Sequence, residues 1–284
     1  MNTNLQELKR FALKIRLGTV EALKSRGFGH IGGSLSVADL LAVLYGNIMR
    51  VDPKNPKWPE RDKMVCSKGH AGPAVYATLG LKGFFPYDEI KTLNQPGTNF
   101  PSHCDRNKTP GVDMTTGSLG QGTSMAVGLA LGDRIKGRDS RTYLIVGDGE
   151  LDEGQAWEAF MFAAANKLDN LYVFIDWNKK QLDGYVSDVL EPFSFKEKMQ
   201  AFGFDTKQVN GNDIEALLNA IKACESVKGK PHAIVMDTVK GCGIKEVEET
   251  MGNHSMSPKP EVFDRWIEGL KAELAQTEGG KIHD

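Results

Sequence analysis

The sequence predicts an α/β domain with a mainly parallel sheet and helices on both of its faces. Four short runs of mostly apolar residues alternate with stretches of helical periodicity, and glycine is enriched, at 31 of 284 residues. Nearly continuous apolar runs are typical of strands buried on both faces, as in parallel sheets. Because ligands of such sheets bind beyond the carboxyl ends of the strands, functional residues are expected in the segments that follow each run.

The elements follow one another along the chain in a simple order. Apolar residues recur at helical spacing over 5–15 and 37–48, and the loop GFGHIGGS joins these two helices. Ser36 and Asp39 are expected to cap the second helix. Only the last residues, TEGGKIHD, resemble a loose end, so residues 1–284 are expected to form a single domain. The strands are expected over 63–67, 142–146, 171–176 and 232–238, with helices over 153–166 and 213–224.

Composition narrows the class of protein. The 35 Lys+Arg and 37 Asp+Glu residues give a formal net charge of −2, which excludes a nucleic-acid partner held mainly by charge. No apolar run approaches the roughly 18 residues of a membrane span, and the first residues lack the apolar core of a secretory signal, so a cytoplasmic protein with no membrane partner is expected. Four cysteines show no zinc or disulfide spacing and are expected to be reduced and mostly buried: Cys66, Cys104, Cys224 and Cys242.

Two polar segments follow neighbouring strands and predict a site for a diphosphate and a metal ion. Gly147, Asp148, Gly149 and Glu150 follow one strand, and Asn178 follows the next. A hard cation such as Mg²⁺ prefers oxygen ligands, which the Asp148 carboxylate, the Asn178 amide and a backbone carbonyl just past Asn178 would supply. The two glycines let the backbone approach a phosphate, and a helix starting near Leu151 would add N–H donors.

Other phosphate-binding and catalytic motifs are absent from the sequence. The stretch GSLGQG at 117–122 has the pattern GxxGxG rather than the dinucleotide pattern GxGxxG, and GxxxxGK[ST] does not occur. The nucleophile motif GxSxG does not occur either.

Four of the six histidines lie in turn-rich segments: His30, His70, His103 and His254. His70 and His254 both come after predicted strands, so they can reach the same crevice. Neutral imidazoles there would suit a polyhydroxylated substrate, because each ring can donate, accept or move a proton near neutral pH. The other two, His232 and His283, are interpreted as structural or incidental.

The stretch GDGELDEGQAWEAFMFAAANKLDNLYVFIDWNKKQLDG resembles the thiamine-diphosphate signature, and its GDGE-x-x-EG-x-x-WEA core resembles transketolase in particular. The segments RFALKIRLGTVEALKSRGFGHIGGSLSVADLLAVLY and PSHCDRNKTPGVDMTTGSLGQG are also similar to that family, so the resemblance covers nearly the whole chain. Departures are GHIGGS for GHPGAP, Ser118 where proline is common, and the lack of a WHG triplet near His254. His103 favours transketolase over the related deoxyxylulose-phosphate synthases.

This resemblance implies a thiamine-diphosphate-binding fold and transfer of a two-carbon ketol unit from a ketose or its phosphate to an aldose or its phosphate, as in pentose phosphate metabolism. Mg²⁺, or Ca²⁺ or Mn²⁺ in its place, would be held by Asp148, Asn178 and the carbonyl of Lys180. His30, His103 and His254 would act on the sugar as catalytic residues. The residues implied around thiamine diphosphate are His70, Gly117, Ser118, Leu119, Gly147, Asp148, Gly149, Glu150, Asn178 and His254.

The resemblance ends with the diphosphate-binding domain. The pyrimidine-binding and C-terminal domains are therefore expected on a partner chain, a C-terminal transketolase subunit, in an α2β2 heterotetramer that is active only when assembled. Glu153 and Glu158 are expected to face a subunit interface by the same resemblance. Two alternatives remain open at this point: the α-type subunit of a thiamine-dependent 2-oxoacid dehydrogenase, and a non-catalytic regulatory subunit.

Overall fold

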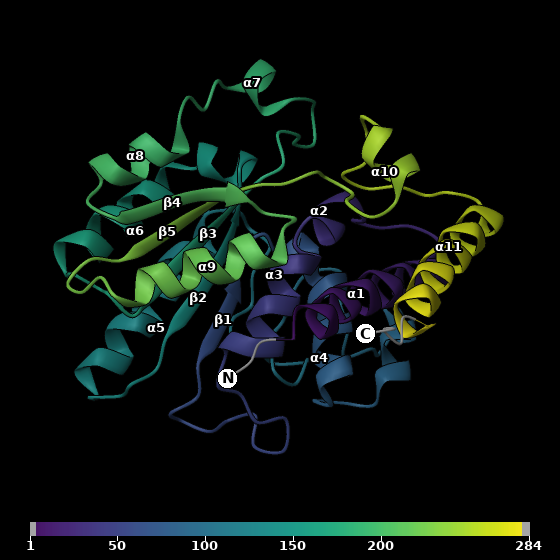
Figure 1. Ribbon diagram of the computed structural model, residues 1–284, viewed down its shortest axis with the longest axis horizontal. Coiled ribbons are helices and arrows are strands. Elements are labelled where there is room, and N and C mark those ends of the chain that lie inside the picture. The colour runs from purple at the N-terminus through teal and green to yellow at the C-terminus, as the bar shows by residue number, and fades with distance from the viewer. Residues whose placement is uncertain (1–3, 280–284) are drawn as a thin grey trace, which may run out of the picture.

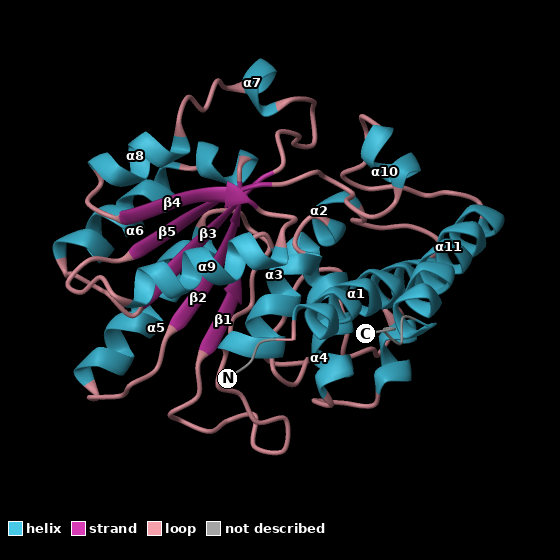
Figure 2. Cartoon of the chain, in the orientation of Figure 1, coloured by secondary structure: helices cyan, strands magenta, loops and turns pink. Residues whose placement is uncertain are grey.

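A single parallel sheet organises the computed structural model, which describes residues 4–279. Within that range the sheet has five strands in the order β1-β2-β3-β5-β4, and all neighbouring pairs are parallel. Figures 1 and 2 show the strands running in one direction, so their carboxyl ends meet at one edge. The strands are β1 (Lys63–Cys66), β2 (Thr142–Gly147), β3 (Leu171–Trp177), β4 (Asp205–Asn210) and β5 (His232–Asp237).

Helices cover both faces of the sheet, as the sequence predicts (Figure 1). One face packs against α5 (Gln121–Ile135), α6 (Gly154–Ala165) and α8 (Phe195–Ala201). The larger layer on the other face contains α1 (Leu5–Arg26), α3 (Ala38–Val43), α4 (Gly72–Lys82), α9 (Ile214–Glu225) and α11 (Pro260–Gly279). Shorter helices are α2 (Gly32–Leu35), α7 (Val186–Val189) and α10 (Lys245–Glu249).

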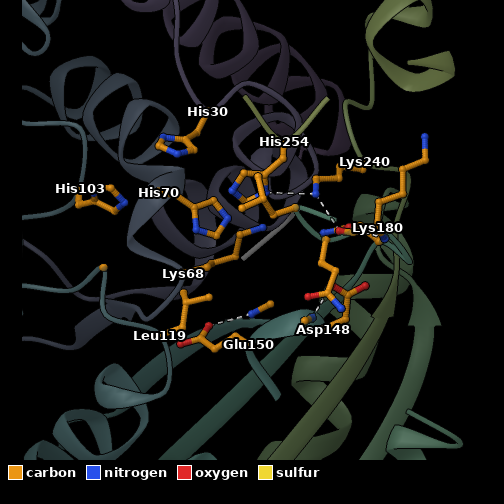
Figure 3. Close-up of a pocket in the computed structure, with 16 residues that line it drawn as sticks. His30, Lys68, His70, His103, Leu119, Asp148, Glu150, Lys180, Lys240 and His254 are labelled. Atoms are coloured by element: carbon orange, nitrogen blue, oxygen red, sulfur yellow. Dashed lines mark hydrogen bonds between the residues drawn. The ribbon is translucent and has the colours of Figure 1, made fainter. Parts of the chain in front are cut away.

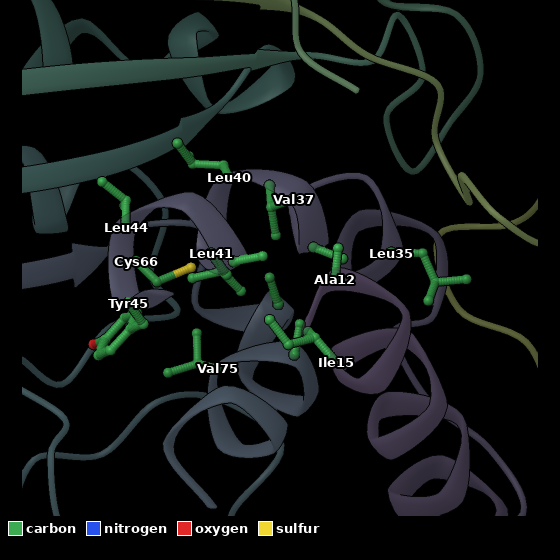
Figure 4. Packing of buried hydrophobic residues seen from close by; sticks show 14 of the residues in the cluster. Ala12, Ile15, Leu35, Val37, Leu40, Leu41, Leu44, Tyr45, Cys66 and Val75 are labelled. Atoms are coloured by element: carbon green, nitrogen blue, oxygen red, sulfur yellow. The ribbon is translucent and has the colours of Figure 1, made fainter. Parts of the chain in front are cut away.

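Alternating side chains on the strands build the two cores. On β2, Tyr143 and Ile145 belong to the core on the α1 side, whereas Leu144 and Val146 belong to the core on the α5 side. All four are fully buried, which explains why this strand is apolar almost throughout. Figure 4 shows how α1, α3 and α4 continue the first core away from the sheet, with side chains such as Ile15, Leu41 and Val75 packed together.

The strand β4 is absent from the sequence prediction. Its sequence, DTKQVN, has no apolar run, and Thr206 is its one buried residue. It lies at the edge of the sheet and pairs only with β5, so it is covered less than the inner strands and does not need an apolar sequence. The four predicted strands are confirmed, with ends that differ from the prediction by one residue.

The predicted helix cap at Ser36 and Asp39 is wrong. The helix α3 begins at Ala38, and its first residues receive no hydrogen bond from a capping side chain. The Ser36 hydroxyl instead donates to Asp176 at 2.7 Å, and Asp39 accepts from the Arg16 guanidinium at 2.5 and 3.0 Å. These buried long-range partners outweigh the local capping interaction.

Three other helix boundaries differ from the sequence prediction. The second predicted helix ends in a π-helical turn over Leu44–Ile48, and the preceding loop already contains α2. The helix expected near Leu151 is a 3₁₀ turn over Gly149–Asp152, and α6 starts only at Gly154. The expected loose end begins inside α11, which extends to Gly279, while His283 lies outside the described residues.

No helix among the described residues is long and apolar enough to cross a membrane. Three of the four cysteines are buried and Cys242 is half-buried, with all four as free thiols, in agreement with the sequence prediction.

Candidate active site

A pocket opens at the carboxyl edge of the sheet, where ligands of parallel sheets bind and where the functional residues are expected (Figure 3). Segments that are far apart in the sequence meet there, following α1, β1, β2, β3 and β5. The pocket is lined by His30, Lys68, His70, His103, Gly117, Leu119, Gly147, Asp148, Gly149, Glu150, Asn178, Lys180, Gln181, Leu182, Lys240 and His254.

Side-chain oxygen atoms that follow two neighbouring strands, β2 and β3, form one wall of the pocket. The Asp148 carboxylate is buried and accepts the backbone N–H groups of Gly149 at 2.9 Å and Lys179 at 2.6 Å. The Asn178 amide oxygen accepts the N–H of Lys180 at 3.2 Å. Burial, and then the charge of Asp176, raises the pKa of Asp148 to about 7. Because burial makes the ionised form of this carboxylate costly, a bound cation would stabilise it.

The Lys180 carbonyl, the third predicted metal ligand, faces a lysine ammonium in this structure. Lys240 Nζ donates to that carbonyl at 2.7 Å and lies 3.4 Å from Nδ1 of His254. The Lys180 carbonyl oxygen therefore points to a position that the Lys240 ammonium occupies, which is the position that a metal ion would take.

Close backbone approaches keep the pocket walls free of side chains. Gly117 has a φ of +141°, and a Cβ atom there would lie 2.9 Å from the His103 ring. A Cβ atom on Gly69 would lie 2.6 Å from the backbone of Thr116. Only glycine accommodates both contacts without a shift of the backbone or of the His103 ring, so the loop after α4 can lie against the loop after β1.

The four predicted histidines gather on one side of the pocket (Figure 3). The centroid of the His30 ring lies 5.6 Å from that of His70 and 5.3 Å from those of His103 and His254. The His70 and His254 rings are 4.7 Å apart. The sequence prediction that His70 and His254 reach the same crevice is confirmed, and His30 and His103 join them there.

All four imidazoles are held in the neutral form at pH 7. Burial is the main cause in each case, and it lowers the pKa of His30 and His103 and lowers that of His70 well below its usual value. For His254, burial followed by the charge of Lys240 lowers the pKa to about 3. Each ring therefore keeps one N–H donor and one nitrogen lone pair.

Two buried lysines in the pocket are missing from the sequence prediction. The side chains of Lys68 and Lys240 are almost inaccessible to solvent, and burial, followed by the charge of Lys68, lowers the pKa of Lys240 to about 8. Lys68 follows the carboxyl end of β1, and Lys240 follows that of β5. Both could therefore have been predicted as functional residues from their positions after strands. Gln181 and Leu182 are the other lining residues that sequence reasoning missed.

Asp176, at the end of β3, joins the segments that form the pocket. Its carboxylate accepts the hydroxyls of Ser36 at 2.7 Å and Thr238 at 2.6 Å, the Asn178 amide at 2.9 Å, and the ammonium of Lys68. Burial opposes its charge, but Lys68 and these hydrogen bonds lower its pKa below the usual value. A single buried anion thus fixes side chains from four segments.

Glu150 and Ser118 differ from the other predicted cofactor-binding residues. Glu150 lines the pocket, but its carboxylate is engaged by the N–H groups of Gly120 at 2.9 Å and Gly147 at 3.0 Å and by the Ser67 hydroxyl. It therefore holds two loops together. Ser118 is exposed, and it is not among the residues that line the pocket.

A parallel sheet with oxygen donors, tight glycine contacts and buried lysines at its carboxyl edge is the arrangement of an α/β domain that binds a phosphorylated ligand. The chain belongs to the transketolase family: residues 8–262 match the family model described as "Transketolase, thiamine diphosphate binding domain".

Similar proteins include separate transketolase subunits. The chain is 46% identical over 271 residues to the 6-deoxy-6-sulfo-D-fructose transketolase subunit SqwG of Clostridium sp. (strain MSTE9), covering 95% of this chain and 98% of that one. It is 37% identical over 273 residues to one subunit of the apulose-4-phosphate transketolase of Actinobacillus succinogenes, covering 96% and 99%.

Solved structures of transketolases share the fold. The transketolase of Pichia stipitis in complex with sedoheptulose-7-phosphate has a TM-score of 0.85 and 28% identity, and the match covers 97% of this chain and 46% of that one. The Campylobacter jejuni enzyme gives a TM-score of 0.84 at 28% identity, covering 97% and 48%. The chain thus spans slightly less than half the length of these transketolases.

The Asp176 contacts generate a prediction about stability. Asp176→Asn leaves the Lys68 ammonium buried without its counter-charge, so we expect the free energy of unfolding to fall by about 3–5 kcal/mol in urea titrations. Asp88→Asn, which removes an exposed ion pair with Lys91, is the control and should change stability far less. Equal effects of the two substitutions would contradict the role assigned to Asp176.

Proposed function

We propose that this chain is the thiamine-diphosphate-binding subunit of a two-chain transketolase that transfers a two-carbon ketol unit from a ketose to an aldose. The observation that carries the proposal is the joining, in one pocket, of the Asp148 and Asn178 oxygen donors with four neutral histidines. One part suits a metal-bound diphosphate, and the other suits a sugar with several hydroxyl groups.

The residues present fit thiamine diphosphate and Mg²⁺, or Ca²⁺ or Mn²⁺ in its place. Asp148, Asn178 and the Lys180 carbonyl offer three oxygens on one wall, the type of ligand that hard cations prefer. Lys240 brings a positive charge to the same pocket, which suits a diphosphate, whereas Asp176 balances the charge of Lys68. Lys240 would release the Lys180 carbonyl when the metal binds and donate to the diphosphate instead.

When bound, thiamine diphosphate supplies the carbon nucleophile for cleavage of the ketose. The chain's own residues bind, orient and handle protons. His70, Gly117, Leu119, Gly147, Gly149 and Glu150 would enclose the cofactor, the last through the loops that it fixes. His30, His103 and His254 would donate to the sugar hydroxyls and shuttle protons through neutral rings.

The sugar substrate is proposed to carry a terminal anionic group. The names of the two relatives above specify a sulfonated ketose and a phosphorylated sugar, respectively. Both of these sugars carry a charged group at one end. The four histidines of this pocket would bind the other end of such a sugar, which carries hydroxyl groups.

Exposed apolar side chains support a partner subunit. Met161 and Phe162 on α6 are exposed, as are Leu182, which lines the pocket, and Leu190 and Phe193 in the segment after it. Large exposed apolar groups in such numbers are typical of an interaction surface. The partner would be a C-terminal transketolase subunit with the pyrimidine-binding domain, in a cytoplasmic α2β2 assembly.

The exposed residues Glu153 and Glu158 lie near the start of α6, the helix that also carries Met161 and Phe162. They would face the subunit interface.

The match to the transketolase family model favours ketol transfer over the activity of a 2-oxoacid dehydrogenase subunit.

The need for a partner can be tested by reconstitution. We expect the purified chain to show no transketolase turnover, and expect activity to appear when the C-terminal subunit, thiamine diphosphate and Mg²⁺ are added. The readout is ketose-dependent transfer to an aldose, with 2-oxoacids as control substrates. Turnover by the single chain, with mass spectrometry showing no partner, would refute the two-chain proposal.

The metal assignment predicts the behaviour of Asp148. In the reconstituted complex, Asp148→Ala should abolish Mg²⁺-dependent binding of thiamine diphosphate in calorimetry, and Asn178→Ala should weaken it strongly, because each removes an oxygen ligand. Asp139→Ala removes an exposed carboxylate just before β2, at the other end of the sheet, and should have no effect. Wild-type affinity in Asp148→Ala would show that the metal lies elsewhere.

His103 is predicted to act on the donor sugar rather than on the cofactor. We expect His103→Ala in the reconstituted enzyme to lower kcat/KM for ketose donors by roughly 10-fold to 1,000-fold, because an oriented hydrogen bond is lost. Cofactor affinity should hardly change. If cofactor binding collapses while the donor kinetics of the remaining active enzyme stay normal, His103 belongs to the cofactor site.

A further inference from the structure

A second cluster of potential ligands lies at the amino-terminal edge of the sheet, at the opposite end of the strands from the pocket. Asp205 is the first residue of β4, His232 is the first residue of β5, and the two are paired in register. Cys224 comes from the last turn of α9. The sequence spacing of these residues gives no sign of a site, because three separate elements bring them together.

The three side chains converge closely. One ligand atom from each, an Asp205 carboxylate oxygen, the Cys224 sulfur and a His232 ring nitrogen, all lie within 4.8 Å of one another. Asp205 Oδ2 and His232 Nδ1 are 3.3 Å apart. In a tetrahedral Zn²⁺ site with bonds of about 2.0–2.3 Å, ligand atoms are separated by about 3.3–3.8 Å. The Asp205 and His232 atoms already have that spacing, and small side-chain rotations would bring the sulfur to it.

We propose that Asp205, Cys224 and His232 form a zinc site that fastens α9 to the strands β4 and β5. Sulfur, imidazole nitrogen and carboxylate oxygen are the ligand types that Zn²⁺ prefers, and they differ from the all-oxygen set at Asp148. A water molecule would supply the fourth ligand, on the side of Asp205, the one partly exposed residue of the three.

The surroundings of the cluster fit a bound ion. His232 and Cys224 are fully buried, and the His232 ring packs against the Tyr172 ring, with 4.6 Å between the ring centroids. Lys207 donates to the other Asp205 oxygen, Oδ1, at 2.6 Å, so Oδ2 can bind the ion while this ion pair is kept. Such an outer contact orients a carboxylate ligand.

Charge balance also favours Zn²⁺ at this place. Burial, followed by the charge of Asp205, raises the pKa of the Cys224 thiol to about 12, so the metal-free protein carries a neutral thiol. On binding, the sulfur–hydrogen bond breaks, the proton leaves to solvent and the sulfur electron pair forms the bond to zinc. The Cys224 thiolate and the Asp205 carboxylate then offset most of the positive charge at the site, since Lys207 stays paired with Asp205, and this limits the cost of holding the ion in a buried position.

Cobalt substitution tests the proposal on the full-length chain, with excess Mg²⁺ present to occupy the oxygen site. Wild-type protein should bind one Co²⁺ per chain with a near-ultraviolet sulfur-to-cobalt charge-transfer band, and Zn²⁺ should displace it. Cys224→Ser should abolish the band. Cys242→Ser, which removes the half-buried thiol elsewhere in the structure, is the matched control and should keep it.

Further readouts protect the test against a folding defect in Cys224→Ser. His232→Gln should weaken Co²⁺ binding by at least about 10-fold, because loss of a ligand exceeds the loss of an outer contact. Zn²⁺ should raise the Tm of wild-type protein and of Cys242→Ser but not of His232→Gln. Folded wild-type protein that binds neither Co²⁺ nor Zn²⁺ at micromolar concentration, or an unchanged band in Cys224→Ser or unchanged affinity in His232→Gln, would overturn the proposal. None of these outcomes depends on transketolase activity.

Discussion

The buried ion pair between Lys68 and Asp176 is the interaction on which the rest of the pocket depends. Both side chains are inaccessible to solvent, and each charge is tolerable only because the other is present. The same carboxylate holds Ser36, Asn178 and Thr238. The loop after α1, the ends of β1 and β3 and the segment after β5 are therefore fixed relative to one another through a single anion.

This arrangement also sets the electrostatics of the pocket. Positive charge on Lys68 and Lys240 adds to burial in lowering the pKa of His70 and His254, and Lys240 does the same for His30, whereas burial alone lowers the pKa of His103. Neutral rings can both donate and accept hydrogen bonds, which suits a substrate with several hydroxyl groups. Asp176 balances the charge of Lys68, so Lys240, which donates to the Lys180 carbonyl, is the lysine whose charge an anionic ligand would meet. The two buried lysines thus help to control histidine protonation, and under the proposed function Lys240 would also bind the diphosphate.

The two edges of the sheet offer different chemistry. At the carboxyl edge, Asp148, Asn178 and the Lys180 carbonyl present only oxygen atoms, whereas Asp205, Cys224 and His232 at the amino edge present oxygen, sulfur and nitrogen. A hard cation would favour the first set of ligands, and zinc would favour the second. A parallel sheet makes this possible because residues that start neighbouring strands meet at one edge and residues that follow them meet at the other.

The sequence by itself determined the α/β class, four of the strands and most of the pocket, because apolar runs mark buried parallel strands and the residues after them must meet at one edge. It also indicated the family through the GDG stretch and the histidine loops. Only the tertiary structure decided the rest. Ser36 and Asp39 leave their local capping roles for buried partners, and the polar strand β4 pairs at the edge of the sheet. Contacts between residues distant in the sequence, such as Lys68 with Asp176, depend on the packed sheet, and no local pattern encodes them.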